Sequence, residues 1–486
     1  MCLFSFTTIR DYHKQLLNGQ TTCVEAVLHY IEEIKQKQYL NAWLEIFEEE
    51  AIDQARTLDT ERQNGSLKGK LHGVVVGLKD VICYKGHKVS ASSQILENFT
   101  SLFNATATQR LLDEGAIIIG RQNCDEFAMG SSNENSAYGA VKNAADETRV
   151  PGGSSGGSAV AVQAGMCMIS LGSDTGGSVR QPADFCGIIG LKPTYGRISR
   201  HGLIAYASSF DQIGILGKSL NDVALIFEII SGEDNFDSTV SSKPVPNISS
   251  CEKCSTPLKI AYFSNSLNHP SLDGEISSSI KSFLQTLTEA GHRVQPVDFE
   301  YLDYIVPAYY VLTTAEASSN LSRYDGVKYG YQNVITDELV NFYKKNRSEA
   351  FGDEVKKRIL LGTFVLSSGY YDAYFTKAQQ VRQLLVEKTL KIFEEFDAII
   401  LPTVPTTAFK IGEKNNDSIA MFLADIYTVF ANLTGIPAIS LPLFTHTTGM
   451  PFGVQVMTSH FNELVLHQIS KNLMDALGKE IRNPAL

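Results

Sequence analysis

Residues 151–182 decide the fold, and they read PGGSSGGSAVAVQAGMCMISLGSDTGGSVRQP. A glycine- and serine-rich loop (151–158) leads into an apolar run from Ala159, and a second glycine-rich turn (172–182) follows. Flexible linkers do not alternate with core segments at such close range, so both loops are expected to be structured. Glycines let backbone N–H groups converge on one point, and a helix start adds its positive dipole end. The loops therefore predict a site for an oxyanion or a phosphate.

Two common motifs compete for this region. A Walker phosphate loop needs G-x-x-x-x-G-K-S/T, but ahead of the Gly-Lys-Ser at 217–219 the first glycine is replaced by Gln212. Residues 152–156 satisfy the G-x-S-x-G pattern of an α/β-hydrolase elbow, which must follow a buried strand. Residues 143–149 are polar and loop-like, so no buried strand precedes the G-x-S-x-G match. Neither the Walker loop nor the hydrolase elbow is therefore favoured.

The charge of the whole chain limits what it can bind. Its 486 residues carry 42 Lys and Arg against 53 Asp and Glu, which gives a formal net charge of −11. A hydrophobic fraction of 43% and a charged fraction of 20% are those of an ordinary folded protein. Without a basic block, this chain is not expected to be the main surface that neutralises nucleic-acid phosphates. A role on nucleic acid would need a partner.

Cysteine usage and hydropathy indicate a compartment. The 8 cysteines are scattered, and residues 1–6 lack a basic segment followed by an apolar one. We therefore expect a reducing, cytoplasmic location. The charge-free run 151–173 is too polar and too broken to span a membrane, so no membrane role is expected. Cys251 and Cys254 have the spacing of half a zinc site, but no second pair follows, and no metal is predicted.

The remaining sequence predicts an α/β organisation. Residues 8–65 are predicted to be helical, with Thr22 and Glu25 forming a cap at one helix start. The proline- and serine-rich stretch 238–257 is typical of a surface connection. Short apolar runs predict buried strands at 74–78, 116–119, 187–191, 259–263, 398–402, 439–441 and 452–456.

The glycine-serine segments 152–158 and 172–182, with Leu78-Lys79-Asp80 at the end of a predicted strand, resemble the amidase signature family. The resemblance implies an α/β amidase signature fold, with a large mixed central β-sheet sandwiched between α-helices. It also implies a single domain over residues 1–486. Its parts would be a helical N-terminal segment (1–65), the signature core (66–237), the surface connection (238–257), and the remainder of the sheet with the substrate pocket (258–486).

The resemblance also implies a Ser-Ser-Lys catalytic triad. Ser178 would be the nucleophile, Ser154 a bridging serine on a cis peptide that relays a proton, and Lys79 the terminal base. The oxyanion hole would be formed by the backbone N–H groups of Thr175, Gly176, Gly177 and Ser178.

The chemistry of these residue types agrees with that assignment. A serine hydroxyl is a weak nucleophile until a base takes its proton, and no histidine lies near the loops in sequence. A lysine with a lowered pKa, such as Lys79 at the end of an apolar strand, can be that base. Alternatively, Lys79 is an ordinary strand-end lysine that reaches solvent. Asp174 and Arg180 are compatible with a pair that braces the turn and equally with a surface pair.

Further segments resemble one branch of the family, the A subunits of glutamyl-tRNA(Gln)/aspartyl-tRNA(Asn) amidotransferases. In this branch Arg358 would bind the α-carboxylate of glutamine, Asp425 its α-ammonium, and Tyr309 would line the pocket. Arg358 alternatively is a solvated charge near Glu354. Asp425 interrupts an apolar run, where an unpaired carboxylate would be costly. The matching segments are 127–139, 309–321, 324–330, 355–362 and 424–437.

The branch implies that the chain hydrolyses glutamine through a γ-glutamyl ester on Ser178 and releases ammonia. It would need no cofactor of its own, while ATP and Mg²⁺ would act at a partner protein. The expected partners are the B and C subunits of a heterotrimer, and misacylated tRNA would bind mainly through the B subunit. Two alternatives remain: a stand-alone amidase for another small amide, and an inactive scaffold subunit. The sequence does not decide between Glu-tRNA(Gln) and Asp-tRNA(Asn) as the aminoacyl-tRNA that is served.

Overall fold

The computed structural model describes residues 5–333, 338–414 and 424–478. Their strands form one mixed sheet of 11 strands, in the order β1-β3-β2-β4-β6-β5-β10-β11-β9-β7-β8. The predicted α/β fold with a large mixed sheet is confirmed. The strands are β1 (Trp43–Ile46), β2 (Val75–Lys79), β3 (Ile117–Gln122), β4 (Ile169–Ser173), β5 (Ile189–Lys192), β6 (Ile213–Gly217), β7 (Lys259–Phe263), β8 (Arg293–Val297), β9 (Ala398–Pro402), β10 (Ala438–Thr445) and β11 (Pro451–Met457).

The direction of the strands changes across the sheet. Strands β3, β2 and β4 are parallel neighbours, as are β9, β7 and β8, whereas β6, β5, β10 and β11 pair antiparallel between these two groups. In the first parallel group, Leu78 of β2 lies opposite Leu171 of β4. The carboxyl ends of β2 and β4 therefore meet at one edge of the sheet, which is where ligands bind in parallel α/β sheets.

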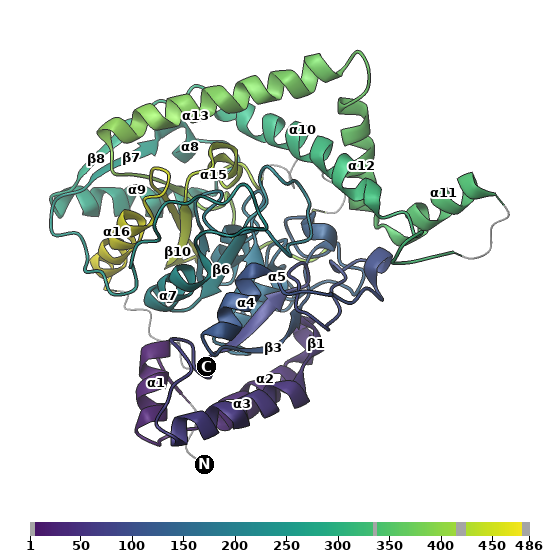
Figure 1. The fold of residues 1–486 in the computed structure, drawn as a ribbon. Coiled ribbons are helices and arrows are strands. Elements are labelled where there is room, and N and C mark those ends of the chain that lie inside the picture. The colour runs from purple at the N-terminus through teal and green to yellow at the C-terminus, as the bar shows by residue number, and fades with distance from the viewer. Residues whose placement is uncertain (1–4, 334–337, 415–423, 479–486) are drawn as a thin grey trace.

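Helices pack along the sheet, and α11 extends away from it (Figure 1). α5 packs against β2 and β4, α6 against β5 and β10, and α16 against β10 and β11, while α10 packs against α12 and α13. The helices are α1 (Ile9–Leu17), α2 (Cys23–Gln36), α3 (Glu48–Gln63), α4 (Thr106–Asp113), α5 (Gly156–Gln163), α6 (Arg180–Phe185), α7 (Leu220–Ile230), α8 (Ser264–Leu267), α9 (Gly274–Glu289), α10 (Leu302–Asn320), α11 (Leu339–Ala350), α12 (Asp353–Val365), α13 (Lys377–Glu395), α15 (Val429–Thr434) and α16 (Glu463–Ala476).

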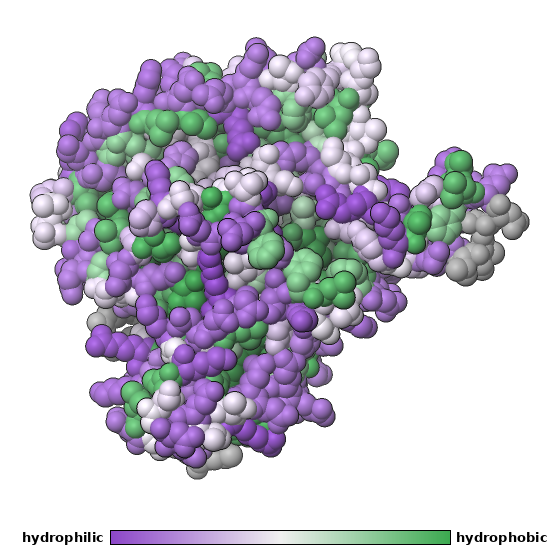
Figure 2. Space-filling model, in the orientation of Figure 1, coloured by the Kyte–Doolittle hydropathy of each residue, from purple (hydrophilic) through white to green (hydrophobic). Residues whose placement is uncertain are grey.

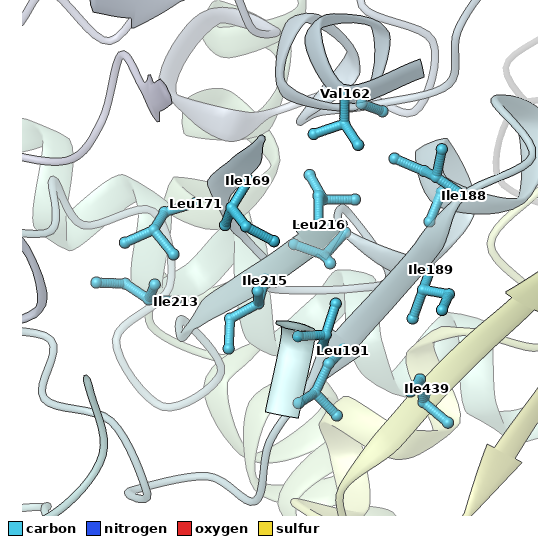
Figure 3. Close-up of a cluster of buried hydrophobic side chains, with 14 of the residues drawn as sticks. Val162, Ile169, Leu171, Ile188, Ile189, Leu191, Ile213, Ile215, Leu216 and Ile439 are labelled. Atoms are coloured by element: carbon cyan, nitrogen blue, oxygen red, sulfur yellow. The ribbon is translucent and has the colours of Figure 1, made fainter. Parts of the chain in front are cut away.

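The core lies between the sheet and its helices. Strands β2, β4, β5, β6 and β9 are buried along their whole length, which explains why several of them are continuous apolar runs in the sequence. Figure 3 shows part of this core, where apolar side chains of β4, β5 and β6 gather with Val162 of α5. On the face drawn in Figure 2, hydrophilic residues predominate and hydrophobic ones form separate patches. None of the described helices combines the length and the apolar character that crossing a bilayer requires.

The N-terminal segment differs from the prediction of a wholly helical 1–65. Helices α1, α2 and α3 are present, and Thr22 and Glu25 form the predicted capping box. Trp43–Ile46, however, forms β1, an edge strand antiparallel to β3. β3 offers these residues backbone partners that a helix could not use, and Glu45 pairs with Arg121 at 2.8 Å. The Trp43 ring packs against Gly77 and Gly120, which have no side chains to displace it.

The connection at 238–257 holds no helix or strand. Ile248 is nevertheless buried, so this stretch is anchored to the core. Cys251 and Cys254 are free thiols of intermediate exposure.

Candidate active site

Lys79 ends β2 and lies in the interior, with a side chain that is 0% exposed. Its Nζ donates to the hydroxyl of Ser154 at 2.7 Å and to those of Ser155 and Ser173 at 2.9 Å. Burial lowers the pKa of Lys79 to about 8, although nearby acidic groups such as Asp125 act in the opposite direction. The alternative of a strand-end lysine that reaches solvent is therefore wrong.

Ser154 lies in the loop that leads into α5. The peptide bond between Gly153 and Ser154 is cis, as expected. Backbone groups of this loop are held by neighbouring segments: the Gly153 N–H donates to Gln181 Oε1 at 3.0 Å, the Asp125 N–H to the Ser154 carbonyl at 3.1 Å, and the Ser155 N–H to the Ser178 carbonyl at 3.1 Å. The two glycine-rich segments of the sequence thus lie against each other in the fold.

Ser178 lies in the turn that follows β4. It is 7% exposed, whereas Ser154 and Lys79 are 0% exposed, so Ser178 has the widest access of the three predicted triad residues. The Gly177 N–H donates to Asp174 Oδ1 at 2.9 Å. The predicted oxyanion hole loses this donor in the conformation observed, because the carboxylate already occupies it. In the described part of the chain nothing accepts from the N–H groups of Thr175, Gly176 or Ser178.

Asp174 and Arg180 form a pair that is completely buried, with Nη2 and Oδ1 3.1 Å apart. Burial alone would raise the pKa of Asp174, but the charge and hydrogen bonds of Arg180 outweigh it and lower the pKa to about 2. The guanidinium also donates to the Thr428 carbonyl and to Gln455 and Asn432, at 2.7–2.8 Å. The pair therefore braces the Ser178 turn against the C-terminal part of the chain, and the surface-pair alternative is wrong.

Arg358 and Asp425 both contact one tyrosine, Tyr310. Arg358, from α12, is buried with its ζ-carbon 5.6 Å from the centre of the Tyr310 ring, and Tyr310 Oη donates to Asp425 Oδ2 at 3.1 Å. Ser131 Oγ donates to the same oxygen at 2.8 Å. Burial raises the pKa of Asp425 to about 6, against the effect of these hydrogen bonds and of Arg358.

Arg358 was predicted either to bind the substrate carboxylate or to be a solvated charge near Glu354. Its Nε donates to Glu354 Oε1 at 2.8 Å, as helical spacing suggested, but its Nη1 donates to Tyr206 Oη at 2.8 Å in the interior. Arg358 is therefore not a solvated charge.

Tyr309 lies beside the Ser178 turn. A methyl group built on Gly176 would come within 2.2 Å of the Tyr309 hydroxyl, so the tyrosine occupies the space that this glycine leaves open. Thr428 Oγ1 donates to the Gly176 carbonyl at 2.8 Å, and the Thr428 N–H donates to the Asp425 carbonyl at 3.1 Å. The Ser178 turn, Tyr309 and Asp425 thus form one continuous site.

A family model named Amidase matches residues 23–466. The chain belongs to the amidase family. The A subunit of the glutamyl-tRNA(Gln) amidotransferase of Chlorobium limicola is 46% identical over 473 residues, which cover 96% of this chain and 99% of the relative. The protein of the same name from Koribacter versatilis is 48% identical over 446 residues, 90% of this chain and 92% of the relative.

Solved amidase structures agree with this assignment. The A subunit of the glutamyl-tRNA(Gln) amidotransferase of Thermotoga maritima superposes with a TM-score of 0.79 at 37% identity, covering 96% of this chain and 94% of that one. The native peptide amidase from Stenotrophomonas maltophilia gives a TM-score of 0.82 at 25% identity, with 99% of both chains covered. The fold is thus shared by amidases with differently named substrates.

Sequence reasoning missed several residues of this amidase site. Ser155 adjoins Ser154 in the quoted motif, but nothing in the motif says that both hydroxyls face Lys79. Ser173 ends a strand that the sequence did not reveal, and Ser131 and Tyr310 meet Asp425 only through the fold. Within the described ranges, no three or more His, Cys, Asp or Glu side chains are grouped so that they could hold a metal ion.

Proposed function

We propose that this amidase is the glutamine-hydrolysing A subunit of a tRNA-dependent amidotransferase, with Ser178 as nucleophile, Ser154 as proton relay and Lys79 as base. Near-full-length similarity to proteins named as such subunits supports the assignment. The observation that carries the chemistry is the buried Lys79 amine, 2.7 Å from the Ser154 hydroxyl in the loop that lies against Ser178.

Acylation begins with the neutral amine of Lys79. It accepts the proton of Ser154 while Ser154 takes that of Ser178, and the Ser178 oxygen attacks the γ-carbonyl carbon of glutamine. The N–H groups of Thr175, Gly176 and Ser178 then donate to the oxyanion, and Gly177 holds the turn through Asp174. The relay returns a proton to the nitrogen of the leaving group, so ammonia departs and a γ-glutamyl ester remains on Ser178.

Deacylation reverses the direction of proton flow. Water gives a proton to the relay and attacks the ester carbonyl, and the same N–H groups bind the second oxyanion. The Ser178 oxygen recovers a proton when glutamate leaves. Because each step is a proton transfer or an acyl transfer, the chain's own residues are enough for this half of the reaction.

Recognition of free glutamine uses the two charged residues that contact Tyr310. Arg358 presents N–H groups to the α-carboxylate, and Asp425 accepts from the α-ammonium, with Tyr309 as the wall nearest Gly176. A neutral amide of equal length would lose both charge-assisted contacts. The pocket therefore favours an amino acid amide over a simple aliphatic amide.

The second half of the reaction belongs to partner proteins. We propose that the chain acts in the cytoplasm in a heterotrimer with B and C subunits. The B subunit would bind misacylated tRNA and use ATP and Mg²⁺ to activate it for the released ammonia, in the manner of an ATP-dependent ligase. The net charge of −11 supports a division in which this chain is not the main contact of the tRNA phosphates.

The test is ammonia release by the purified chain, alone and together with candidate B and C subunits, from glutamine, asparagine and butyramide. We expect glutamine to have the highest kcat/KM, and Ser178→Ala and Lys79→Ala each to abolish turnover without loss of the fold. Preference for butyramide would instead indicate a stand-alone amidase. Wild-type turnover in Ser178→Ala would remove the nucleophile assignment.

A further inference from the structure

Asp125 follows β3 and lies completely buried between two loops of the site. Its carboxylate accepts from two backbone groups, the N–H of Asn133 at 2.9 Å and that of Asn135 at 3.1 Å. Its own N–H donates to the carbonyl of Ser154 at 3.1 Å. One residue thus contacts both the peptide that carries the relay serine and the loop 126–135.

That loop leads to the substrate side of the site. Phe127, Ala128 and Asn133 have positive φ values of 51°, 58° and 63°, a conformation that residues other than glycine adopt only where surrounding contacts support it. Between them lies Ser131, whose hydroxyl donates to Asp425. The position of Ser131 therefore depends on the contacts that hold the loop.

The space around the carboxylate is filled. A methyl group on Gly153 would come within 2.1 Å of Asp125 Oδ2, and one on Gly130 within 2.3 Å of its Cγ. Gly130 and Gly153 belong to the two different loops, so the carboxylate is packed against both. Asn133 Oδ1 accepts from the Gly157 N–H at 3.0 Å and forms a second link between the loops. A shift of this group would move both loops together.

Only an acceptor fits this position. Two backbone N–H groups point at the carboxylate, one at each oxygen. An asparagine has nearly the same shape but carries a donor in place of one oxygen, so one backbone N–H would face another N–H and lose its partner. Burial raises the pKa of Asp125 to about 6, so the group is ionised at neutral pH, near the positive charges of Lys79 and Arg358.

We infer that Asp125 is a positioning residue that aligns the proton relay and the substrate pocket at once, by clamping the Ser154 loop and the Ser131 loop to each other. The relay part of this inference holds for any substrate. The pocket part rests on the proposed use of glutamine.

The experiment separates these two parts with two readouts. Phenylmethylsulfonyl fluoride sulfonylates an activated serine with loss of fluoride, and the rate of this reaction at Ser178 reports the relay without using the amino acid pocket. KM for glutamine reports the pocket. The charge of Asp125 raises the pKa of Lys79, so both readouts are taken at about pH 9, where the amine is mainly neutral with or without that charge. In Asp125→Asn we expect the sulfonylation rate to fall and KM to rise, each by about tenfold, as for one lost hydrogen bond to a charged group.

Two other variants serve as comparisons. Asp425→Asn should raise KM and leave the sulfonylation rate unchanged. Asp222→Asn alters another buried carboxylate, which accepts from the N–H of Ile9 in α1 at 3.0 Å. This carboxylate holds the N-terminal segment and neither of the two site loops, so the variant should change neither readout. All rates are referred to the folded fraction measured by circular dichroism.

Asp125→Asn with wild-type sulfonylation and wild-type KM would overturn the inference. If that variant does not fold, Ser131→Ala tests the same loop with Asp125 in place. A raised KM with unchanged sulfonylation supports the link from this loop to the pocket, and an unchanged KM contradicts it. Failure of glutamine as a substrate would disprove the proposed function, but the sulfonylation assay would still test Asp125.

Discussion

At the scale of single residues, the burial of Lys79 sets the pH range in which the proposed proton relay would work. Its pKa is lowered to about 8 mainly because burial disfavours the charged form. A base must be neutral to accept a proton, so the active fraction grows as the pH rises through this value. Two hydroxyls besides Ser154 accept from the amine, and these hold its position in either protonation state.

We therefore expect kcat/KM for glutamine to rise about tenfold from pH 7 to a plateau above about pH 9, with the half-way point near pH 8, since kcat/KM reports ionisations of the free enzyme. The measurement is a pH series of steady-state ammonia release. Ser155→Ala removes one neighbour of the amine and should shift the inflection without abolishing it. A flat profile between about pH 6.5 and 9 would show that Lys79 is not the base.

Asp425 predicts a second, separate pH effect. Its pKa is raised to about 6 by burial, so it is ionised above this value and loses its charge as the pH falls through it. KM for glutamine should therefore increase below pH 6. Asp425→Asn should raise KM by about 10 to 100-fold at neutral pH, the value of a hydrogen bond to a charged group. Its KM should vary less near pH 6 than that of the wild type because, of the two site carboxylates with a pKa of about 6, only Asp125 then remains. An unchanged KM in this variant would remove Asp425 from the pocket.

At the scale of elements, the buried pair of Asp174 and Arg180 ties the turn after β4 to the segment around α15. Removing one member leaves the other charge buried without compensation. We expect Asp174→Asn to lower the free energy of unfolding by about 3 to 5 kcal/mol, measured by urea denaturation.

The exposed pair of Arg56 and Asp53, 2.9 Å apart, is the matched control. Asp53→Asn should lower the free energy of unfolding by less than about 1 kcal/mol. Equal losses in the two variants would contradict the bracing role of the buried pair.

The Ser178 turn itself depends on a glycine. A methyl group at Gly176 would meet the hydroxyl of Tyr309 at 2.2 Å, so Gly176→Ala must displace either the turn or the tyrosine. We expect kcat to fall by about tenfold or more, because displacing oxyanion donors weakens transition-state binding. Gly274→Ala, at a position with open space at the start of α9, should leave kcat unchanged. Wild-type kcat in Gly176→Ala would contradict the observed packing.

Strands were predicted correctly where the sequence has a continuous apolar run. Strands were missed where their formation depends on pairing with a neighbouring strand or where no such run stands out. The predicted strands correspond to β2, β3, β5, β7, β9, β10 and β11, whereas β1, β4 and β6 were missed. A second strand was expected after the helix that follows residues 259–263, and β8 is that strand, although its residues were not located from the sequence.

β4 alternates its two apolar residues with serine and glycine, so it is not a continuous apolar run. β6 is similar in composition to β5, which was predicted, and nothing in its own sequence explains the miss. β8 contains a proline and lies at the sheet edge, where proline is tolerated, and β1 exists because β3 offers it an open edge.

At the scale of the whole molecule, one sheet brings together residues that are distant in sequence. Lys79 and Ser173 meet because β2 and β4 are parallel neighbours, and Ser131 meets Asp425 across 294 positions of the chain. The signature motif predicts the triad of Lys79, Ser154 and Ser178, and the structure places the Lys79 amine at the Ser154 hydroxyl, in a loop that lies against Ser178. The motif could not predict Ser131, Tyr310 or Asp125, because their roles come from contacts that only the folded chain creates.

The proposed function depends above all on hydrolysis of glutamine through an ester on Ser178. The most direct test is to quench the protein with acid during turnover of glutamine and to locate the acyl group by peptide mass spectrometry. We predict one γ-glutamyl group on the peptide that contains Ser178, absent in Ser178→Ala and in Lys79→Ala. A γ-glutamyl group on another residue, or steady glutamine turnover by Ser178→Ala, would contradict the account.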